Sequence, residues 1–208
     1  SRAGDSVNGI ISNSQLPAID SFYGVRLIYL NYNTAATLDI DGAKVCSSPI
    51  HKTPGNNNAA HVWSNFITVN GAQAFSVPVA VAGVVAGHYI PGVIITDFMP
   101  VLSVPRTDVV GAPPLLRVAS HIAPSAAASI HPSYGSASFL GLNNLALNPG
   151  LKQATYMFPG TLATLTTTGN STDEAGSVMQ PIGAIFYYNT HAASLACFGD
   201  SLFQGNGT

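Results

Sequence analysis

The sequence predicts a mainly β protein, built as an antiparallel, jelly-roll-like β-sandwich. Gly, Pro and Asn residues, among them 20 Gly and 14 Pro, interrupt the chain at short and regular intervals. The stretches between these interruptions are rich in Val, Ile, Thr, Tyr and Phe, and none keeps a helical spacing of apolar residues over three turns. Short strands spaced by ~8 to 12 residues, with turn-forming residues between them, are typical of antiparallel sandwiches.

The individual strands follow from local patterns. Within residues 24–31, the side chains of Val25, Leu27 and Tyr29 should share one face of a strand, because successive side chains of a strand point to opposite faces. Short apolar or alternating stretches of the same kind predict the other strands, over residues 37–40, 43–47, 62–69, 73–77, 92–99, 115–122, 153–158, 183–188 and 194–198.

Turns and loops are marked by the residue types that favour them. Asp41-Gly42 favours a hairpin turn between the strands over 37–40 and 43–47, and Asn70-Gly71 favours a turn after the strand over 62–69. Prolines make residues 100–105 an edge segment, since proline cannot donate to a strand ladder. Residues 123–138 are expected to form a long loop or an irregular edge, residues 160–180 a surface loop, and residues 140–147 the one short helix.

The last expected strand differs from the others. Residues 194–198 begin with a serine and are otherwise apolar rather than alternating, which is typical of a strand covered on both faces in a parallel sheet flanked by helices. The sequence therefore predicts two parts, a β-sandwich over residues 1–190 and the truncated start of an α/β domain over residues 191–208.

Composition argues against two classes of partner. Only 8% of the residues are charged, against about 25% in an average soluble domain, and the seven Lys and Arg are scattered. Nucleic-acid binding needs clustered positive charge, and a membrane span needs ~20 consecutive apolar residues. We therefore expect no nucleic-acid partner and no membrane partner. A polar, nearly uncharged surface suits neutral ligands such as sugars, and favours a secreted or periplasmic location over the cytoplasm without fixing it.

The two cysteines, Cys46 and Cys197, lie far apart in the sequence. We expect both to be free, buried thiols that behave as small apolar residues. A disulfide between them is the alternative, although nothing in the sequence requires it. Neither cysteine lies in a spacing typical of metal ligands.

A candidate nucleophile lies near the end of the sequence. The apolar run 192–196 leads through Cys197 and Phe198 into Gly199-Asp200-Ser201-Leu202. A serine on a turn that follows a strand can expose its hydroxyl while its own backbone N–H faces the oxyanion of an acyl-transfer intermediate. Ser201 is then the expected nucleophile, Gly199 permits the tight backbone geometry, and Asp200 braces the turn by accepting backbone donors.

These residues, with a glycine four positions after the serine, resemble the first catalytic block of the SGNH, or GDSL, hydrolases. The residues before the block are similar to the β-sandwich domain that precedes the hydrolase domain in some members. The resemblance implies that residues 191–208 begin an α/β SGNH hydrolase domain. It also implies a carboxylic ester hydrolase whose substrate is an acylated carbohydrate or a small ester.

The resemblance further implies catalytic groups that the residues after Ser201 do not contain. In the family, a glycine and an asparagine supply more oxyanion donors, and a late Asp-x-x-His supplies the orienting carboxylate and the base. Only seven residues follow Ser201. We expect the missing C-terminal hydrolase segment to come from the same gene or from a second chain, and this chain to be inactive alone. No cofactor and no metal ion are expected.

Two non-catalytic interpretations stay open. In the first, the chain is a stand-alone β-sandwich that binds glycan or assembles into a larger structure, and Gly199-Asp200-Ser201 is incidental. In the second, it is a coat-like jelly roll of the kind found in viral shells, which are also low in charge and rich in turns.

Some other residues carry weaker signals. His121 and His131 flank a loop rich in Pro, Ser and Ala and could bind a metal ion, although no acidic or cysteine residue lies near them in the sequence. Arg106 and Asp108 should form an exposed ion pair that contributes little stability. Aromatic residues that could include a sugar-stacking platform, although most should pack in the core, are Tyr29, Tyr32, Trp63, Phe66, Tyr89 and Tyr134.

Overall fold

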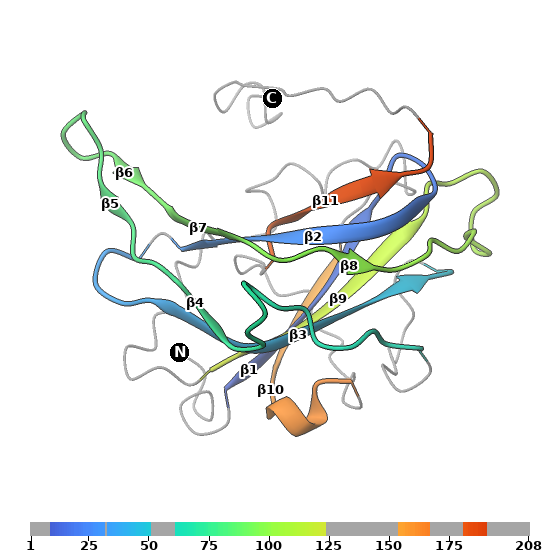
Figure 1. Ribbon diagram of the computed structural model, residues 1–208, viewed down its shortest axis with the longest axis horizontal. Coiled ribbons are helices and arrows are strands. Elements are labelled where there is room, and N and C mark those ends of the chain that lie inside the picture. Colours follow the sequence, from blue (N-terminus) through green and yellow to red (C-terminus); the bar gives the residue numbers. More distant parts are fainter. Residues whose placement is uncertain (1–8, 32, 51–60, 124–153, 167–180, 191–208) are drawn as a thin grey trace, which may run out of the picture.

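The computed structural model describes residues 9–31, 33–50, 61–123, 154–166 and 181–190. Over these residues the protein is mainly β, and its antiparallel strands form two main sheets that lie in separate layers (Figure 1). The prediction of a mainly β, antiparallel fold is therefore confirmed. Among the described residues, no helix is long and apolar enough to cross a membrane.

The first layer is a five-stranded sheet. In spatial order its strands are β10 (Ala154–Pro159), β1 (Ile10–Pro17), β9 (Leu115–Ile122), β3 (Leu38–Ser48) and β4 (Phe75–Val77). The strand β9 lies between β1 and β3 and is buried along its whole length. In this central strand, Arg117 pairs with Gln15 on one side and with Cys46 on the other.

The second layer is a four-stranded sheet. Its strands are β11 (Gly183–Tyr188), β2 (Phe22–Asn31) and β7 (Gly92–Ile95), and β8 (Met99–Pro100) pairs with β2 further along the same edge as β7. The side chains of Val25, Leu27 and Tyr29 on β2 are fully buried, while Arg26 and Ile28 between them are partly exposed. The predicted alternation of this strand is confirmed.

The two layers share one apolar core. Leu27 on β2 belongs to the same buried cluster as Val45 on β3 and Val118 on β9, so the inner faces of both sheets pack together. The hydroxyl of Tyr29 also lies 2.8 Å from Oγ of Ser120, which links β2 to β9 across the core. Two antiparallel sheets that bury a common core form a sandwich.

A small hairpin extends from one end of the sandwich. Its strands are β5 (Val81–Ala82) and β6 (Tyr89–Ile90), which pair with each other in a separate two-stranded sheet. We call residues 81–90 the arm, and Figure 1 shows it projecting away from both layers. Its large apolar side chains are all more than half exposed: Val81, Val84, Val85, Tyr89 and Ile90.

The predicted hairpin turn at Asp41-Gly42 is wrong. The strand β3 runs continuously through both residues, and its pairing with β9 passes from Ile40 opposite Ile122 to Gly42 opposite His121. Asp41 is therefore the extra residue of a β-bulge. Both halves of β3 pair with the same distant strand rather than with each other, and a local turn pattern cannot reveal this.

Residues 62–69 do not form the predicted regular strand. They follow β3 through single backbone hydrogen bonds, from Ser64 N to Val45 O at 2.9 Å and from Ile67 N to Ala43 O at 2.8 Å. The turn at Asn70-Gly71 is confirmed, since both residues have positive φ angles, of 52° and 81°. The predicted strand over 92–99 is divided into β7 and β8.

The strand β1 was not predicted, because its middle residues are polar. These residues, Ser12, Asn13, Ser14 and Gln15, are all buried between β9 and β10. The predicted strand over 194–198 and the predicted helix over 140–147 lie outside the described residues. The division of the chain at residues 190 and 191 stays a prediction.

Candidate functional site

The predicted catalytic residues, Gly199, Asp200 and Ser201, lie outside the described residues, as do Cys197 and His191. The histidines in the described ranges are candidates for the base that would activate a serine. A catalytic base must be free to accept a proton at the nitrogen that faces the nucleophile. Of the six histidines in the chain, His61, His88 and His121 lie in the described ranges.

His121 forms the pair with a carboxylate that is typical of a catalytic base, but its second nitrogen is occupied. Its Nδ1 lies 2.8 Å from Oδ2 of Asp41, and its Nε2 lies 3.1 Å from the carbonyl oxygen of Gly160. The side chain is only 4% exposed. Both ring nitrogens therefore lie within hydrogen-bond distance of an oxygen of the protein. His121 therefore links the bulge of β3 to the residue that follows β10, and both of its ring nitrogens are engaged in this link.

His61 is engaged by a buried cation. Its Nε2 lies 2.8 Å from Nη1 of Arg117, and arginine can only donate, so His61 accepts at Nε2 and is neutral in this contact. Burial, and then the charge of Arg117, lower the pKa of His61. His88 is exposed in the arm, away from both sheets.

Cys46 is not a reactive thiol. It is free and buried on β3, and burial raises the pKa of its thiol to about 12, with the charge of Arg117 opposing the rise. A thiol with so high a pKa carries almost no thiolate at neutral pH. The expectation of a free, buried Cys46 is confirmed, and Cys197 lies outside the described residues.

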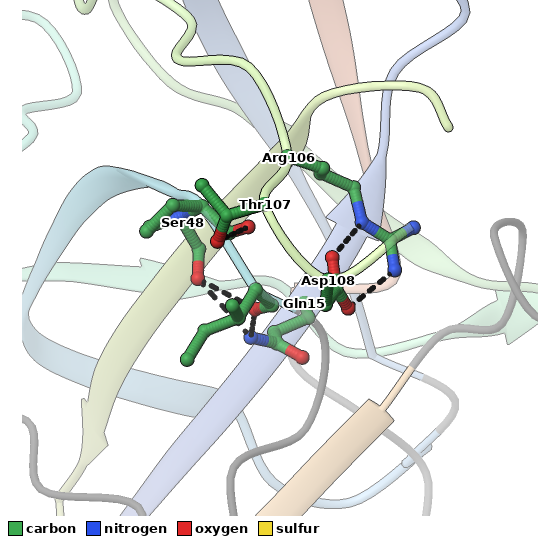
Figure 2. Close-up of polar contacts among 7 residues, drawn as sticks. Gln15, Ser48, Arg106, Thr107 and Asp108 are labelled. Atoms are coloured by element: carbon green, nitrogen blue, oxygen red, sulfur yellow. Dashed lines mark hydrogen bonds and ion pairs between the residues drawn. The ribbon is translucent and has the colours of Figure 1, made fainter. Parts of the chain in front are cut away.

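A polar cluster ties β1 to the end of β3 and to the loop before β9 (Figure 2). Gln15 Nε2 donates to the Ile50 carbonyl at 3.1 Å, and Ser48 Oγ donates to the same oxygen at 2.9 Å. Arg106 holds Asp108 through two contacts of 2.8 and 2.7 Å. The ion pair is thus confirmed, but its predicted exposure is wrong for Arg106, whose side chain is 1% exposed.

Three of the six aromatic residues named from the sequence are structural. Tyr29 is buried against Phe75, while Trp63 and Phe66 pack on a second small cluster on the outer side of the five-stranded sheet. Tyr89 is exposed in the arm, at 57%. Tyr32 and Tyr134 lie outside the described residues.

Three other rings gather on the sandwich, two of them exposed and the third, Tyr187, partly buried. Tyr23, Phe98 and Tyr187 form what we call the aromatic cluster, on the outer face of the four-stranded sheet. The ring centroids of Phe98 and Tyr187 are 5.0 Å apart at an angle of 88°, and Tyr23 lies 6.1 Å from Phe98 and 6.2 Å from Tyr187. Tyr23 is 38% exposed and Phe98 is 39% exposed.

A β-bulge and a glycine build this cluster. Phe22 pairs with Tyr188 and Gly24 with Tyr187, so Tyr23 is an extra residue on β2. A bulge of this kind re-aims side chains, and here Tyr23 is exposed although both of its neighbours are buried. A β-carbon on Gly24 would lie 2.2 Å from the ring of Phe98, so that ring rests on the bare backbone of Gly24.

Hydrogen bonds fix the segment that carries Phe98. Thr96 Oγ1 accepts from the Leu27 N–H at 2.8 Å. The carboxylate of Asp97 accepts from Thr68 Oγ1 at 2.6 Å, and from the N–H groups of Gly71 at 2.9 Å and Asn70 at 3.2 Å. The hydrogen bond from Thr68, followed by that from Gly71, lowers the pKa of Asp97. Phe98 therefore follows two residues that hydrogen bonds hold in place.

The sequence carried only a weak signal for this cluster. Tyr23 and Tyr187 lie in or beside predicted strands, but the extra residue on β2 is visible only once β11 is paired with it. Within the described ranges, no three His, Cys, Asp or Glu side chains come together in a way that could hold a metal ion. His131, the other residue considered as a metal ligand, lies outside them.

Comparisons with known proteins add no relative. No protein-family model matches the chain, and no curated protein matches it significantly.

Proposed function

We propose that this chain is the N-terminal part of a serine carboxylic ester hydrolase of the SGNH, or GDSL, type. In this proposal a jelly-roll-like β-sandwich precedes a catalytic block in which Ser201 is the nucleophile. The observation that carries the proposal is the apolar run 192–196 that leads into Phe198-Gly199-Asp200-Ser201-Leu202. The preferred substrate is an acylated carbohydrate or a small ester.

The reaction requires a base that comes from outside the described residues. Ser201 Oγ would attack the ester carbonyl, the alcohol would leave with a proton, and water would then release the acid from the acyl-enzyme. The proton must pass through a base, and among the described histidines His61 and His121 are both committed to structural contacts. A downstream hydrolase segment, on the same or a second chain, is the proposed source of that base.

The fold supports a block that begins near residue 191. β11 is the last described strand, it pairs with β2, and its Phe186 and Tyr188 pack against the shared core. Thr190 then donates to Asp20 at 3.3 Å, next to the start of β2. In the proposal, a new folding unit follows directly after this strand.

A fluorophosphonate probe tests the proposal, because such probes label serines activated for nucleophilic attack. We expect no labelling of the 208-residue chain alone, and labelling at Ser201, located by mass spectrometry, in a chain extended with its downstream sequence. The Ser201→Ala variant of the extended chain should lose labelling and on the order of 10³-fold or more of ester hydrolysis. If the extended chain is not labelled at Ser201, the hydrolase proposal is wrong.

A further inference from the structure

We infer that Asn70 is a latent deamidation site, and that the carboxylate of Asp97 blocks its reaction in the folded protein. The inference concerns the sandwich, and it does not depend on Ser201 or on ester hydrolysis. It rests on the pair Asn70-Gly71, on the geometry of the turn that this pair forms, and on the hydrogen bonds that Asp97 accepts from it.

The reaction is an attack within the chain. The backbone nitrogen of Gly71 forms a bond to Cγ of Asn70 and loses its proton, and the side-chain amide leaves as ammonia. Water then opens the succinimide ring to an aspartate or to an isoaspartate, in which the backbone runs through the former side chain. Glycine at the second position favours the attack, because it has no β-carbon to hinder it. Asn70 is exposed, so the water that completes the reaction has access to it.

The folded turn holds the attacking nitrogen away from its target. Val69 and Ala72 exchange two backbone hydrogen bonds of 2.9 and 3.0 Å, and both residues between them have positive φ angles. These features define a type I′ hairpin turn, whose first central residue has a ψ angle near ~30°. At that angle the nitrogen of the next residue points away from the side chain. Ring closure therefore requires the peptide unit between Asn70 and Gly71 to turn over.

Asp97 opposes this rotation. Its carboxylate accepts the Gly71 N–H at 2.9 Å and the Asn70 N–H at 3.2 Å, so the peptide unit that must turn over is bonded to a charged acceptor. Asp97 is itself tied to the segment before the turn, because Thr68 Oγ1 donates to its carboxylate at 2.6 Å and its own N–H donates to the Thr68 carbonyl at 2.8 Å. The hydrogen bond from Thr68, followed by that from Gly71, lowers the pKa of Asp97, which keeps the carboxylate charged at neutral pH.

Deamidation would remove the contacts that block it. Either product carries a new carboxylate on residue 70, the residue whose N–H binds the carboxylate of Asp97, and like charges at short range repel each other. An isoaspartate also adds a methylene group to the backbone, which a two-residue turn cannot accommodate. The modified turn should therefore no longer hold Asp97, and the change is not reversed when the chain refolds.

Peptide mass spectrometry after incubation at mildly alkaline pH measures the reaction at Asn70. In the folded parent chain, Asn70 should deamidate about tenfold or more slowly than in the same chain unfolded in guanidinium chloride, because the turn must first open. Asp97→Ala should raise the rate in the folded chain about tenfold, since the turn then loses its hydrogen bonds to a charged group. The other Asn-Gly pairs, at residues 8–9 and 206–207, lie in separate peptides and are counted separately.

Two further variants separate a local effect from a loss of overall stability. Asp97→Asn keeps one acceptor oxygen for the two N–H groups, so it should fold like the parent chain and still deamidate Asn70 faster. Val118→Ala removes buried methyl groups from β9 without touching the turn, and while folded it should leave the rate at Asn70 as slow as in the parent chain. Circular dichroism shows which variants are folded.

Three results would overturn the inference. The first is equal deamidation of Asn70 in the folded and the unfolded parent chain. The second is a folded Asp97→Ala or Asp97→Asn variant that reacts no faster than the parent chain. The third is an acceleration in folded Val118→Ala as large as that in Asp97→Ala, because overall stability rather than Asp97 would then control the reaction.

Discussion

Gly24 is a residue whose missing side chain shapes the surface. A β-carbon there would lie 2.2 Å from the ring of Phe98, so Gly24→Ala must displace that ring. We expect Gly24→Ala to lower the free energy of unfolding by ~1 to 3 kcal/mol, the usual effect of inserting a group into occupied space. Urea unfolding monitored by circular dichroism measures it.

Adding Gly24→Ala to the Phe98→Ala variant tests directly whether the ring causes this loss of stability. In Phe98→Ala the ring is gone, so adding Gly24→Ala should cost much less than it does in the parent chain. A double-mutant cycle isolates this coupling. If the cost of Gly24→Ala is the same in both backgrounds, the ring does not rest on Gly24.

His61 should make stability depend on pH. An unfolded histidine gains its proton near pH ~6.5, whereas burial and the charge of Arg117 lower the pKa of folded His61. Between the folded and unfolded pKa values the unfolded chain binds more protons, so stability falls as the pH falls below ~6.5 and the effect is absent well above it.

His61→Gln is the matched test of this pH dependence. Glutamine keeps an acceptor for Arg117 Nη1 but has no proton to gain in this range. We expect the loss of unfolding free energy between about pH 8 and about pH 5 to be smaller in the variant than in the parent chain. Equal losses would show that His61 does not titrate differently in the folded protein.

At the scale of elements, the pairing of a segment with distant strands decides its structure more than its own composition does. β1 is polar in its middle, yet all of Ser12, Asn13, Ser14 and Gln15 are buried, and the neighbouring strands β9 and β10 pair with its backbone on both edges. In β3, the Asp41-Gly42 pair forms a bulge rather than a turn, and that bulge brings Asp41 to His121. Neither outcome follows from the local pattern of these segments.

The arm is the element that we expect to open first. β5 and β6 pair only with each other among the described strands, and an isolated two-stranded hairpin is marginally stable. In limited digestion with a protease of broad specificity, the first cut among the described residues should fall within 83–88. Sequencing of the fragments locates it.

A shortened arm provides the control for this digestion. Replacing residues 83–88 by Asn-Gly, a minimal hairpin turn, should remove the early cut and leave the unfolding temperature unchanged. An early cut within β2 or β9 instead would mean that the sandwich, rather than the arm, opens first.

At the scale of the whole molecule, the shared core makes the sandwich one cooperative unit. The buried cluster joins residues of β2 to residues of β3 and β9, and Phe186 and Tyr188 of β11 pack against it. A chain that ends at Thr190 should therefore unfold at the same temperature as the 208-residue chain, within ~2 °C. Differential scanning calorimetry measures the two midpoints.

The matched variant removes one more strand. A chain that ends at Pro181 lacks β11, which uncovers part of the core and one edge of β2, and we expect it to unfold at a much lower temperature or to be insoluble. A large drop for the chain ending at Thr190 would contradict the proposed division at residues 190 and 191.

Much of the fold can be predicted from local sequence patterns. The strands over 115–122 and 183–188 have their predicted bounds, the buried face of β2 follows its alternating pattern, and Asn70-Gly71 forms the expected turn. These features depend on side-chain periodicity and on residues that favour turns, which act within a few positions. The catalytic block, by contrast, rests on a resemblance carried by residues 198–202.

The sequence alone therefore determined the mainly β class, most of the strands and the candidate nucleophile Ser201. The tertiary structure alone decided that polar β1 is an interior strand of its sheet, that His121 is committed to Asp41 and Gly160, and that Tyr23, Phe98 and Tyr187 meet on one face. The physical reason is the same in each case. These features arise from pairing between strands that are distant in the sequence, where a neighbour's hydrogen bonds or one extra residue decide which side chain faces which.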